Sequence, residues 1–159
     1  DELAGRIDGG AWRLECNTLL LSAGDYYLGK PQTYMNRSGH AARCLVERFD
    51  LRPERILVVF DDVHLPLGRL RLRRRGGPGG HRGMESIIGS LRTEEIPRLR
   101  LGVGETEKER SGDQLVDFVL SEFRSDERPE VDGMVDRSVE AVETWLREGI
   151  GEAMNRTNG

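Results

Sequence analysis

The sequence predicts one soluble domain of the α/β or α+β class, and three observations support this prediction. The chain has 159 residues, of which 36% are hydrophobic and 33% charged, enough for a substantial buried core. The apolar run 56–60 is typical of a buried strand, and segments 69–73 and 98–104 alternate polar and apolar residues as half-buried strands do. Other segments repeat apolar residues at helical spacing.

In the first part of the chain, Leu3 and Ile7 lie one helical turn apart, which predicts the last turns of a helix over 1–7. Segments 18–23 and 26–31 predict two strands joined by a hairpin turn at Gly24-Asp25. Ser38 is expected to cap a helix over 39–49. The run 56–60 predicts a strand that is buried on both faces and ends at Asp61-Asp62.

In the second part, 69–73 predicts a strand with Leu70 and Leu72 inward and its arginines outward. The glycines of 76–80 predict a loop, followed by a helix over 81–92, a strand over 98–104 and a short extended piece at 118–120. A long apolar stripe predicts a helix over 129–149. Because no repeat or low-complexity linker is present, we expect one domain over 1–159.

Charge is distributed unevenly. Residues 1–104 contain 17 Lys/Arg and 13 Asp/Glu, whereas residues 105–159 contain 7 and 15, so a polyanion is expected to meet the first two-thirds. No apolar run reaches membrane-spanning length, and the two cysteines have no metal or redox spacing. We therefore expect a cytoplasmic protein with no membrane partner.

The most unusual stretch is 69–83, where six arginines surround five glycines. The glycine loop lacks the Lys-Ser/Thr of a phosphate-binding P-loop and the order of a dinucleotide fingerprint, so we predict no nucleotide cofactor. By alternation, Arg69, Arg71 and Arg73 share one face of their strand, as Arg98 and Arg100 do on theirs. If the strands are neighbours, these side chains converge to grip phosphate; the alternative is a solvated strand face.

Two further clusters suggest chemistry. Asp61, Asp62 and His64 follow the apolar run and allow either a metal site or a carboxylate that orients a catalytic imidazole. Asn36, in the segment TYMN (33–36), offers an amide that both donates and accepts hydrogen bonds, as binding a peptide backbone requires. A turn asparagine that only caps itself is the alternative.

Four segments together, KPQTYMNRSG (30–39), ILVVFDDVHLPLG (56–68), GGPGGHRGMESII (76–88) and RLRLGVG (98–104), resemble the bacterial peptidyl-tRNA hydrolase family. DFVLSEF (117–123) and the terminal EAMNR (152–156) agree, so the resemblance covers essentially the whole chain. It implies a single α/β domain with a twisted mixed sheet flanked by helices. It also implies hydrolysis of the ester that joins a peptide to the 3′ end of tRNA, without a metal or other cofactor.

The resemblance also implies roles for particular residues. Asp61 matches the aspartate that supports a histidine base. Tyr34, Met35, Asn36, His81 and Arg82 match positions of the peptide-binding cleft, although Arg82 stands where many relatives have asparagine. Asn36 is also expected to be a catalytic residue, together with Asp61. Arg73 and Arg100 match basic residues that clamp the tRNA 5′ phosphate, with Arg71 as an assisting residue.

One departure concerns the N-terminal side of the family pattern. The first family strand and the RHN motif with the histidine base are absent from 1–159, and His40, His64 and His81 align elsewhere. Because ester hydrolysis needs a base for the attacking water, we expect residues 1–159 alone to be poorly active. The intact family is expected to be monomeric, whereas an unfilled sheet position would favour self-association.

Two alternatives to the hydrolase stay open. One is a non-catalytic RNA-binding relative of the same fold, against which Asp61 and Asn36 count, and the other is a metal hydrolase built on Asp61, Asp62 and His64. The residues encoded before Asp1 separate the first from the enzyme, and chelator sensitivity separates the second.

Overall fold

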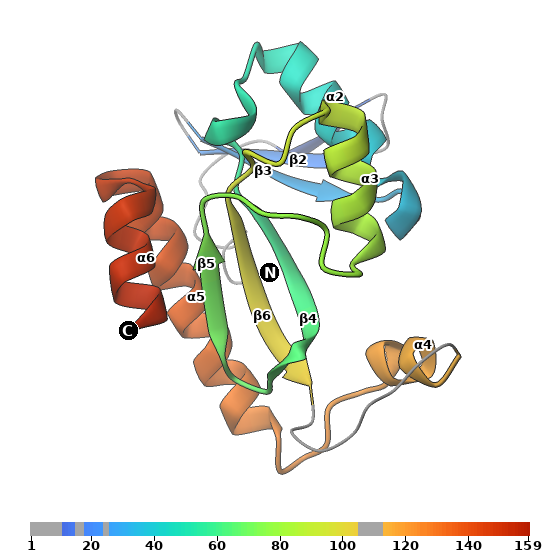
Figure 1. Cartoon of the computed structure of the whole chain (residues 1–159), viewed down its shortest axis with the longest axis vertical. Helices are drawn as coiled ribbons and strands as arrows, with labels where there is room; N and C mark the ends of the chain where they lie inside the picture. Colours follow the sequence, from blue (N-terminus) through green and yellow to red (C-terminus); the bar gives the residue numbers. More distant parts are fainter. Residues whose placement is uncertain (1–10, 15–17, 24–25, 105–112) are drawn as a thin grey trace. The chain divides into compact units, whose positions relative to one another are not determined.

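A computed structural model of the chain describes residues 11–14, 18–23, 26–104 and 113–159 (Figure 1). The chain divides into two compact units. One takes in residues up to Ile56 together with Gly76–Ile96, and the other takes in Leu57–Arg75 and Pro97–Gly159. Each contains a three-stranded sheet and helices, which confirms the α/β class. The organisation as one domain stays a prediction.

The sheet of the first unit is antiparallel, in the order β1-β2-β3. Its strands are β1 (Ala11–Leu14), β2 (Thr18–Ala23) and β3 (Tyr26–Pro31). Strands β2 and β3 confirm the two predicted strands, and β1 is an additional one. The predicted hairpin turn at 24–25 and the predicted helix over 1–7 lie outside the described residues.

Two α-helices and two short 3₁₀ helices complete the described part of the first unit: η1 (Met35–Arg37), α2 (Ser38–Phe49), η2 (Pro53–Arg55) and α3 (Arg82–Leu91). The predicted cap of α2 is wrong. Ser38 is already the first helical residue, and its hydroxyl donates to the carbonyl of Met35 at 2.8 Å instead of accepting from the helix. The 3₁₀ turn η1 leads directly into α2, so the chain enters the helix without a polar side-chain cap.

Helices α2 and α3 cross closely at Gly39. A Cβ at this position would lie 2.1 Å from the backbone oxygen of Ser86, and the Gly39 N–H donates to the Ser86 hydroxyl at 3.0 Å. A second bond runs from the Arg43 guanidinium to the carbonyl of Ser90 at 2.8 Å. The crossing therefore fixes η1, which precedes α2, relative to the start of α3.

The sheet of the second unit is mixed, in the order β4-β6-β5. Strand β6 (Arg98–Gly104) runs parallel to β4 (Val58–Pro66) and antiparallel to β5 (Leu70–Arg73). The prediction for β4 is partly wrong, because the strand continues through the acidic residues to Pro66. It is not buried on both faces either, since Val59 is 47% exposed.

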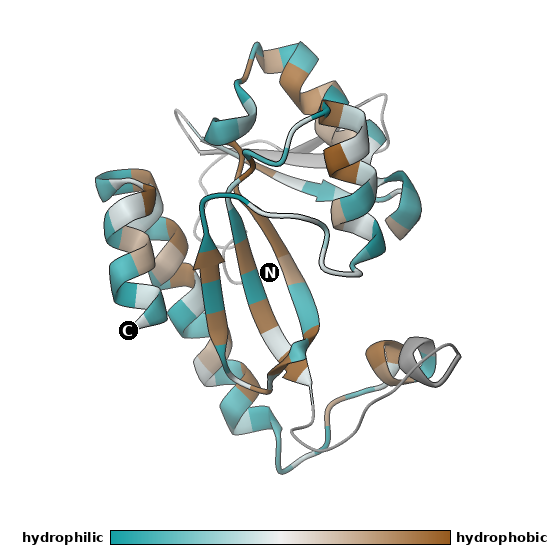
Figure 2. Cartoon of the chain, in the orientation of Figure 1, coloured by the Kyte–Doolittle hydropathy of each residue, from teal (hydrophilic) through white to brown (hydrophobic). Residues whose placement is uncertain are grey.

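One face of this sheet is apolar, and we call it the leucine face: Leu70, Leu72, Leu99 and Leu101. Leu72 and Leu99 are fully buried and pack with Ala141 of α5 (Arg128–Glu148) and Ala153 of α6 (Ile150–Asn158). Hydrophobic residues recur along these strands and helices (Figure 2). The predicted inward leucines and the predicted long helix are both confirmed.

Strand β5 lies at an edge of this sheet, and Asn158 of α6 provides hydrogen bonds to that edge. The Asn158 amide accepts from the Leu72 N–H and donates to the Leu72 carbonyl, both at 2.9 Å. The side chain therefore satisfies the two backbone groups that a further strand would pair with.

Residues 118–120, predicted to be extended, belong to a helix instead. Helix α4 (Asp113–Leu120) includes them, and the Ser121 hydroxyl donates to the Phe118 carbonyl at 2.7 Å as the helix ends. A three-residue apolar run is too short to reveal helical spacing, which explains the error.

Candidate phosphate-binding face and cleft residues

The arginines of β5 and β6 lie directly opposite one another. The antiparallel register pairs Arg71 with Arg100 and Arg73 with Arg98, so the four side chains share the face opposite the leucine face. We call this the arginine face. It confirms that the two arginine-bearing strands are neighbours. Arg73 is exposed, whereas Arg98 is only 3% exposed and Arg100 is half-buried, so the solvent-facing part of the cluster is Arg73 and Arg71 with the end of Arg100.

Asp62 also belongs to the arginine face. Its side chain is buried, and one carboxylate oxygen accepts from Nε of Arg100 while the other accepts from the His64 N–H at 2.8 Å. These contacts account for both oxygens of the carboxylate. Within the described residues, no group of three or more His, Cys, Asp or Glu is placed to hold a metal ion.

Asp61 points the other way. Successive side chains of a strand alternate between faces, and Asp61 pairs with Leu101 whereas Asp62 pairs with Gly102. The residue that the sequence singled out as the base-orienting carboxylate therefore lies on the leucine face. Its neighbour in the sequence, Asp62, is the one that contacts Arg100.

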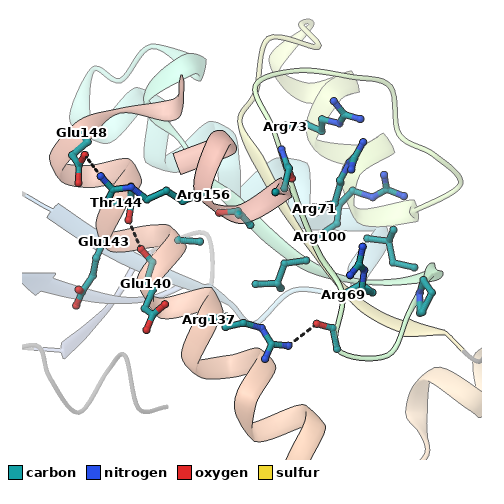
Figure 3. Close-up of a pocket in the computed structure, with 18 of the residues that line it drawn as sticks. Arg69, Arg71, Arg73, Arg100, Arg137, Glu140, Glu143, Thr144, Glu148 and Arg156 are labelled. Carbon is teal, nitrogen blue, oxygen red and sulfur yellow. Dashed lines mark hydrogen bonds and ion pairs between the residues drawn. The ribbon is translucent and has the colours of Figure 1, made fainter. Parts of the chain in front are cut away.

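A cavity of about 1080 Å³ lies in this unit, lined on the strand side by arginines and on the helix side by residues of both signs (Figure 3). The strand side consists of Arg69, Arg71, Arg73 and Arg100, and α5 contributes Glu140, Glu143 and Glu148. All three predicted phosphate-binding residues thus line one cavity.

Arg137 and Arg156 form hydrogen bonds on the helix side of this cavity. Arg137 donates to the carbonyl of Gly68 at 2.8 Å, which joins α5 to the turn before β5. Arg156 donates to Glu152 at 2.8 Å and to Glu148 at 2.7 Å. The hydrogen bond that Arg156 donates to Glu152, together with the negative charge of Glu148, raises the pKa of Arg156, so this side chain stays charged.

The predicted cleft residues belong to the first unit. Tyr34 precedes η1 and is 79% exposed, while Met35 and Asn36 are exposed on it. His81 is the N-cap of α3: its Nδ1 accepts from the Met84 N–H at 3.1 Å, at the start of the helix predicted over 81–92. Arg82, the first residue of α3, is exposed.

Met35 and His81 approach one another at Gly83. A Cβ on Gly83 would lie 2.6 Å from Sδ of Met35 and 2.8 Å from Cε1 of His81. The structure therefore brings two of the predicted cleft residues together through a glycine that leaves room for both. Their roles in binding a peptide remain predictions.

Two residues with clear structural roles were missed by the sequence reasoning. Asp62 was considered as a metal ligand or as a carboxylate that orients an imidazole, and its contact with Arg100 was missed because the register of β4 and β6 cannot be read from 60–66 alone. Asn158 contacts a residue 86 positions away, and the sequence around it gives no signal for that contact.

Comparisons with known proteins support the family resemblance found in the sequence. The family model for peptidyl-tRNA hydrolase matches residues 6–159. A peptidyl-tRNA hydrolase of Persephonella marina (strain DSM 14350 / EX-H1) is 45% identical over 136 residues, which cover 84% of this chain and 70% of that protein. One of Synechococcus sp. (strain JA-3-3Ab) is 49% identical over 129 residues, which cover 81% of this chain and 56% of that protein.

Solved structures define the class of fold. The crystal structure of peptidyl-tRNA hydrolase from Acinetobacter baumannii superposes with a TM-score of 0.87 at 28% identity, covering 99% of this chain and 81% of that one. The fold is thus that of the class of hydrolases to which this peptidyl-tRNA hydrolase belongs. The chain belongs to the peptidyl-tRNA hydrolase family. Among the described residues, no helix is both long and apolar enough to span a membrane.

Proposed function

We propose that this protein hydrolyses the ester bond between the peptide and the tRNA of peptidyl-tRNA. The observation that carries the proposal is the pairing of Arg71 with Arg100 across two strands, in a chain that belongs to the peptidyl-tRNA hydrolase family. Like charges directly opposite one another destabilise a sheet, and although Asp62 offsets part of this repulsion at Arg100, the exposed Arg73 on the same face supports an anionic ligand. A phosphate of tRNA supplies that anion.

In the proposed reaction, a histidine imidazole takes a proton from water, and the oxygen attacks the ester carbonyl carbon. The tetrahedral intermediate then breaks its bond to the ribose oxygen, which takes the proton from the imidazolium and leaves as the 3′-terminal hydroxyl of tRNA, while the peptide leaves with a carboxyl group. Asp61 orients the imidazole and stabilises its protonated form. We propose no cofactor, a cytoplasmic location and action as a monomer.

His81 does not fit the role of the base, because its Nδ1 already caps α3 and holds the ring in place. His64 lies three positions after Asp61 on β4. In a regular strand this spacing would place the two side chains on opposite faces. The pairing register of β4 shifts between Asp62 and Pro66, so alternation does not assign His64 to the face of Asp61. The family resemblance assigns the base to neither of them, nor to His40.

The other proposed roles concern substrate binding. The Asn36 amide is exposed next to Met35, and we propose that it pairs with the peptide backbone while Tyr34 and Met35 contact side chains. His81 and Arg82, at the start of α3, are proposed to border the same cleft. The phosphate is held by the arginine face.

The test follows the release of an N-blocked amino acid from its tRNA. The assay uses the natural protein, including any residues encoded before Asp1. Asp61→Ala should lower kcat by at least about 100-fold and change tRNA affinity little, since the lost contribution belongs to proton transfer. Equal losses in kcat and in affinity would contradict the orienting role. Tight tRNA binding without any hydrolysis would support the non-catalytic RNA-binding alternative instead.

A further inference from the structure

We infer that Asp62 is a positioning residue for phosphate: it holds the guanidinium of Arg100 so that the remaining donors of Arg100 face the 5′ phosphate of tRNA. The inference rests on the proposed function. It assigns a role to a carboxylate that lies among arginines and that no part of the proposed hydrolysis uses.

The geometry of Asp62 is fixed from two directions. The side chain is only 8% exposed, one oxygen contacts Nε of Arg100, and the other is bound by the His64 N–H at 2.8 Å. A carboxylate held in this way has a single orientation, and it imposes that orientation on its partner. Arg100, in contrast, is 29% exposed and therefore reaches solvent beyond its contact with Asp62.

Arginine is suited to this arrangement. The guanidinium carries five N–H donors in a planar fork, and the Nε contact with Asp62 uses one edge of it. The two terminal nitrogens then retain donors for a phosphate, and the planar group no longer rotates about its long side chain. A lysine at the same position would offer charge without this fixed plane.

Asp62 also balances the charge of the face. Arg71 lies directly opposite Arg100, and two cations in this position repel one another. A buried carboxylate on the same face lowers that repulsion before a phosphate arrives. The same carboxylate, however, repels the phosphate itself, so charge alone predicts that its removal tightens tRNA binding.

The two effects have opposite signs, and this makes the inference testable. The variant is Asp62→Asn, which keeps the shape of the side chain and an acceptor for the His64 N–H but removes the charge. The matched control is Asp61→Asn, which makes the same change in charge one residue away on the opposite face. Binding is measured with deacylated tRNA that carries either a 5′ phosphate or a 5′ hydroxyl.

For the wild type we expect tighter binding of the 5′-phosphorylated tRNA. Asp62→Asn should reduce that preference by about fivefold, as expected when one charge-assisted contact loses its geometry, and leave the affinity for the 5′-hydroxyl tRNA nearly unchanged. Asp61→Asn should leave the preference as it is. A preference that is unchanged or larger in Asp62→Asn overturns the inference.

Arg100→Lys keeps the test informative if Asp62→Asn does not fold. Lysine retains the charge but has no Nε to hold, so the preference for 5′ phosphate should again fall, and the double variant should lose no more than either single variant. A lysine variant with the wild-type preference overturns the inference. If the wild type binds 5′-phosphorylated and 5′-hydroxyl tRNA equally well, the arginine face does not bind the 5′ phosphate and the inference fails. The proposed hydrolysis is decided separately, by its own assay.

Discussion

The contact between Asn158 and β5 gives a prediction about stability. The Asn158 side chain makes two hydrogen bonds of 2.9 Å to the backbone of Leu72, a residue with no exposed surface. Asn158→Ala removes both and leaves a backbone N–H and a carbonyl without these partners. A buried polar group that loses its partner costs about 1–3 kcal/mol, and water is expected to recover part of this at the edge of the sheet.

We therefore expect Asn158→Ala to lower the free energy of unfolding by about 2–3 kcal/mol. For a chain of this size, each kcal/mol lowers Tm by about 2–4 °C, so the expected decrease is roughly 5–10 °C. The measurement is thermal and urea unfolding followed by circular dichroism. Asn155→Ala is the matched control, because Asn155 is an exposed asparagine on the same helix.

The reasoning would be refuted if Asn158→Ala and Asn155→Ala unfolded at the same temperature. Asn158→Asp provides a second check. A carboxylate still accepts from the Leu72 N–H but opposes the Leu72 carbonyl with a second oxygen, so this variant should be no more stable than Asn158→Ala. Wild-type stability in Asn158→Asp would mean that the bond to the Leu72 carbonyl contributes nothing.

Further predictions concern helix packing, Arg73 of the arginine face and Asp61. Gly39→Ala should lower the free energy of unfolding by about 2 kcal/mol or more, because its Cβ would meet the backbone oxygen of Ser86 at 2.1 Å. Gly83→Ala should also destabilise the protein, because its Cβ would meet the end of the Met35 side chain at 2.6 Å and the His81 ring at 2.8 Å. The loss should be smaller than for Gly39→Ala, since both neighbours are side chains and not backbone; similar Tm values for the two variants would contradict this. Arg73→Ala should weaken tRNA binding and reduce its salt slope by about one charge. When Arg73→Ala is combined with Asp61→Ala, the free-energy losses that the two single variants cause in kcat/KM should add. A strong deviation from additivity would place the two residues at one site.

The pairing of Arg100 with Asp62 also changes how Arg100 should be studied. Arg100→Ala leaves a buried carboxylate without its cation, and such a loss typically costs about 3–5 kcal/mol. Weak tRNA binding by that variant would thus mix a folding defect with a lost phosphate contact. The lysine variant, or a double variant that also neutralises Asp62, avoids the problem.

Local patterns predicted the elements well where one face of the element is buried. The alternation over 98–104 and the apolar stripe of the long helix are both imposed by the leucine face, so they are visible in the sequence. The run at 56–60 misled because Val59 is apolar but exposed, and apolar character alone does not prove burial. The alternation of the arginines predicted a shared face correctly, since it depends only on strand geometry.

The relations between elements could not be predicted in the same way. Whether Asp61 or Asp62 meets the arginines depends on which residue of β4 lies beside which residue of β6, and that register is set by packing far along the chain. The contact of Asn158 with Leu72 depends on where α6 ends relative to the edge of β5. Both relations depend on tertiary packing, which local sequence patterns do not determine.

The register of β4 gives two chemically identical neighbours different environments. Insertion or deletion of a single uncharged residue before Asp61 would exchange their faces, so the carboxylate that now meets Arg100 would turn to the apolar face without any change in net charge. An insertion of two residues would keep each side chain on its face and only shift it along the strand. Strand β4 should therefore tolerate insertions or deletions of an even number of residues better than those of an odd number. Single-residue substitutions would not reveal this difference.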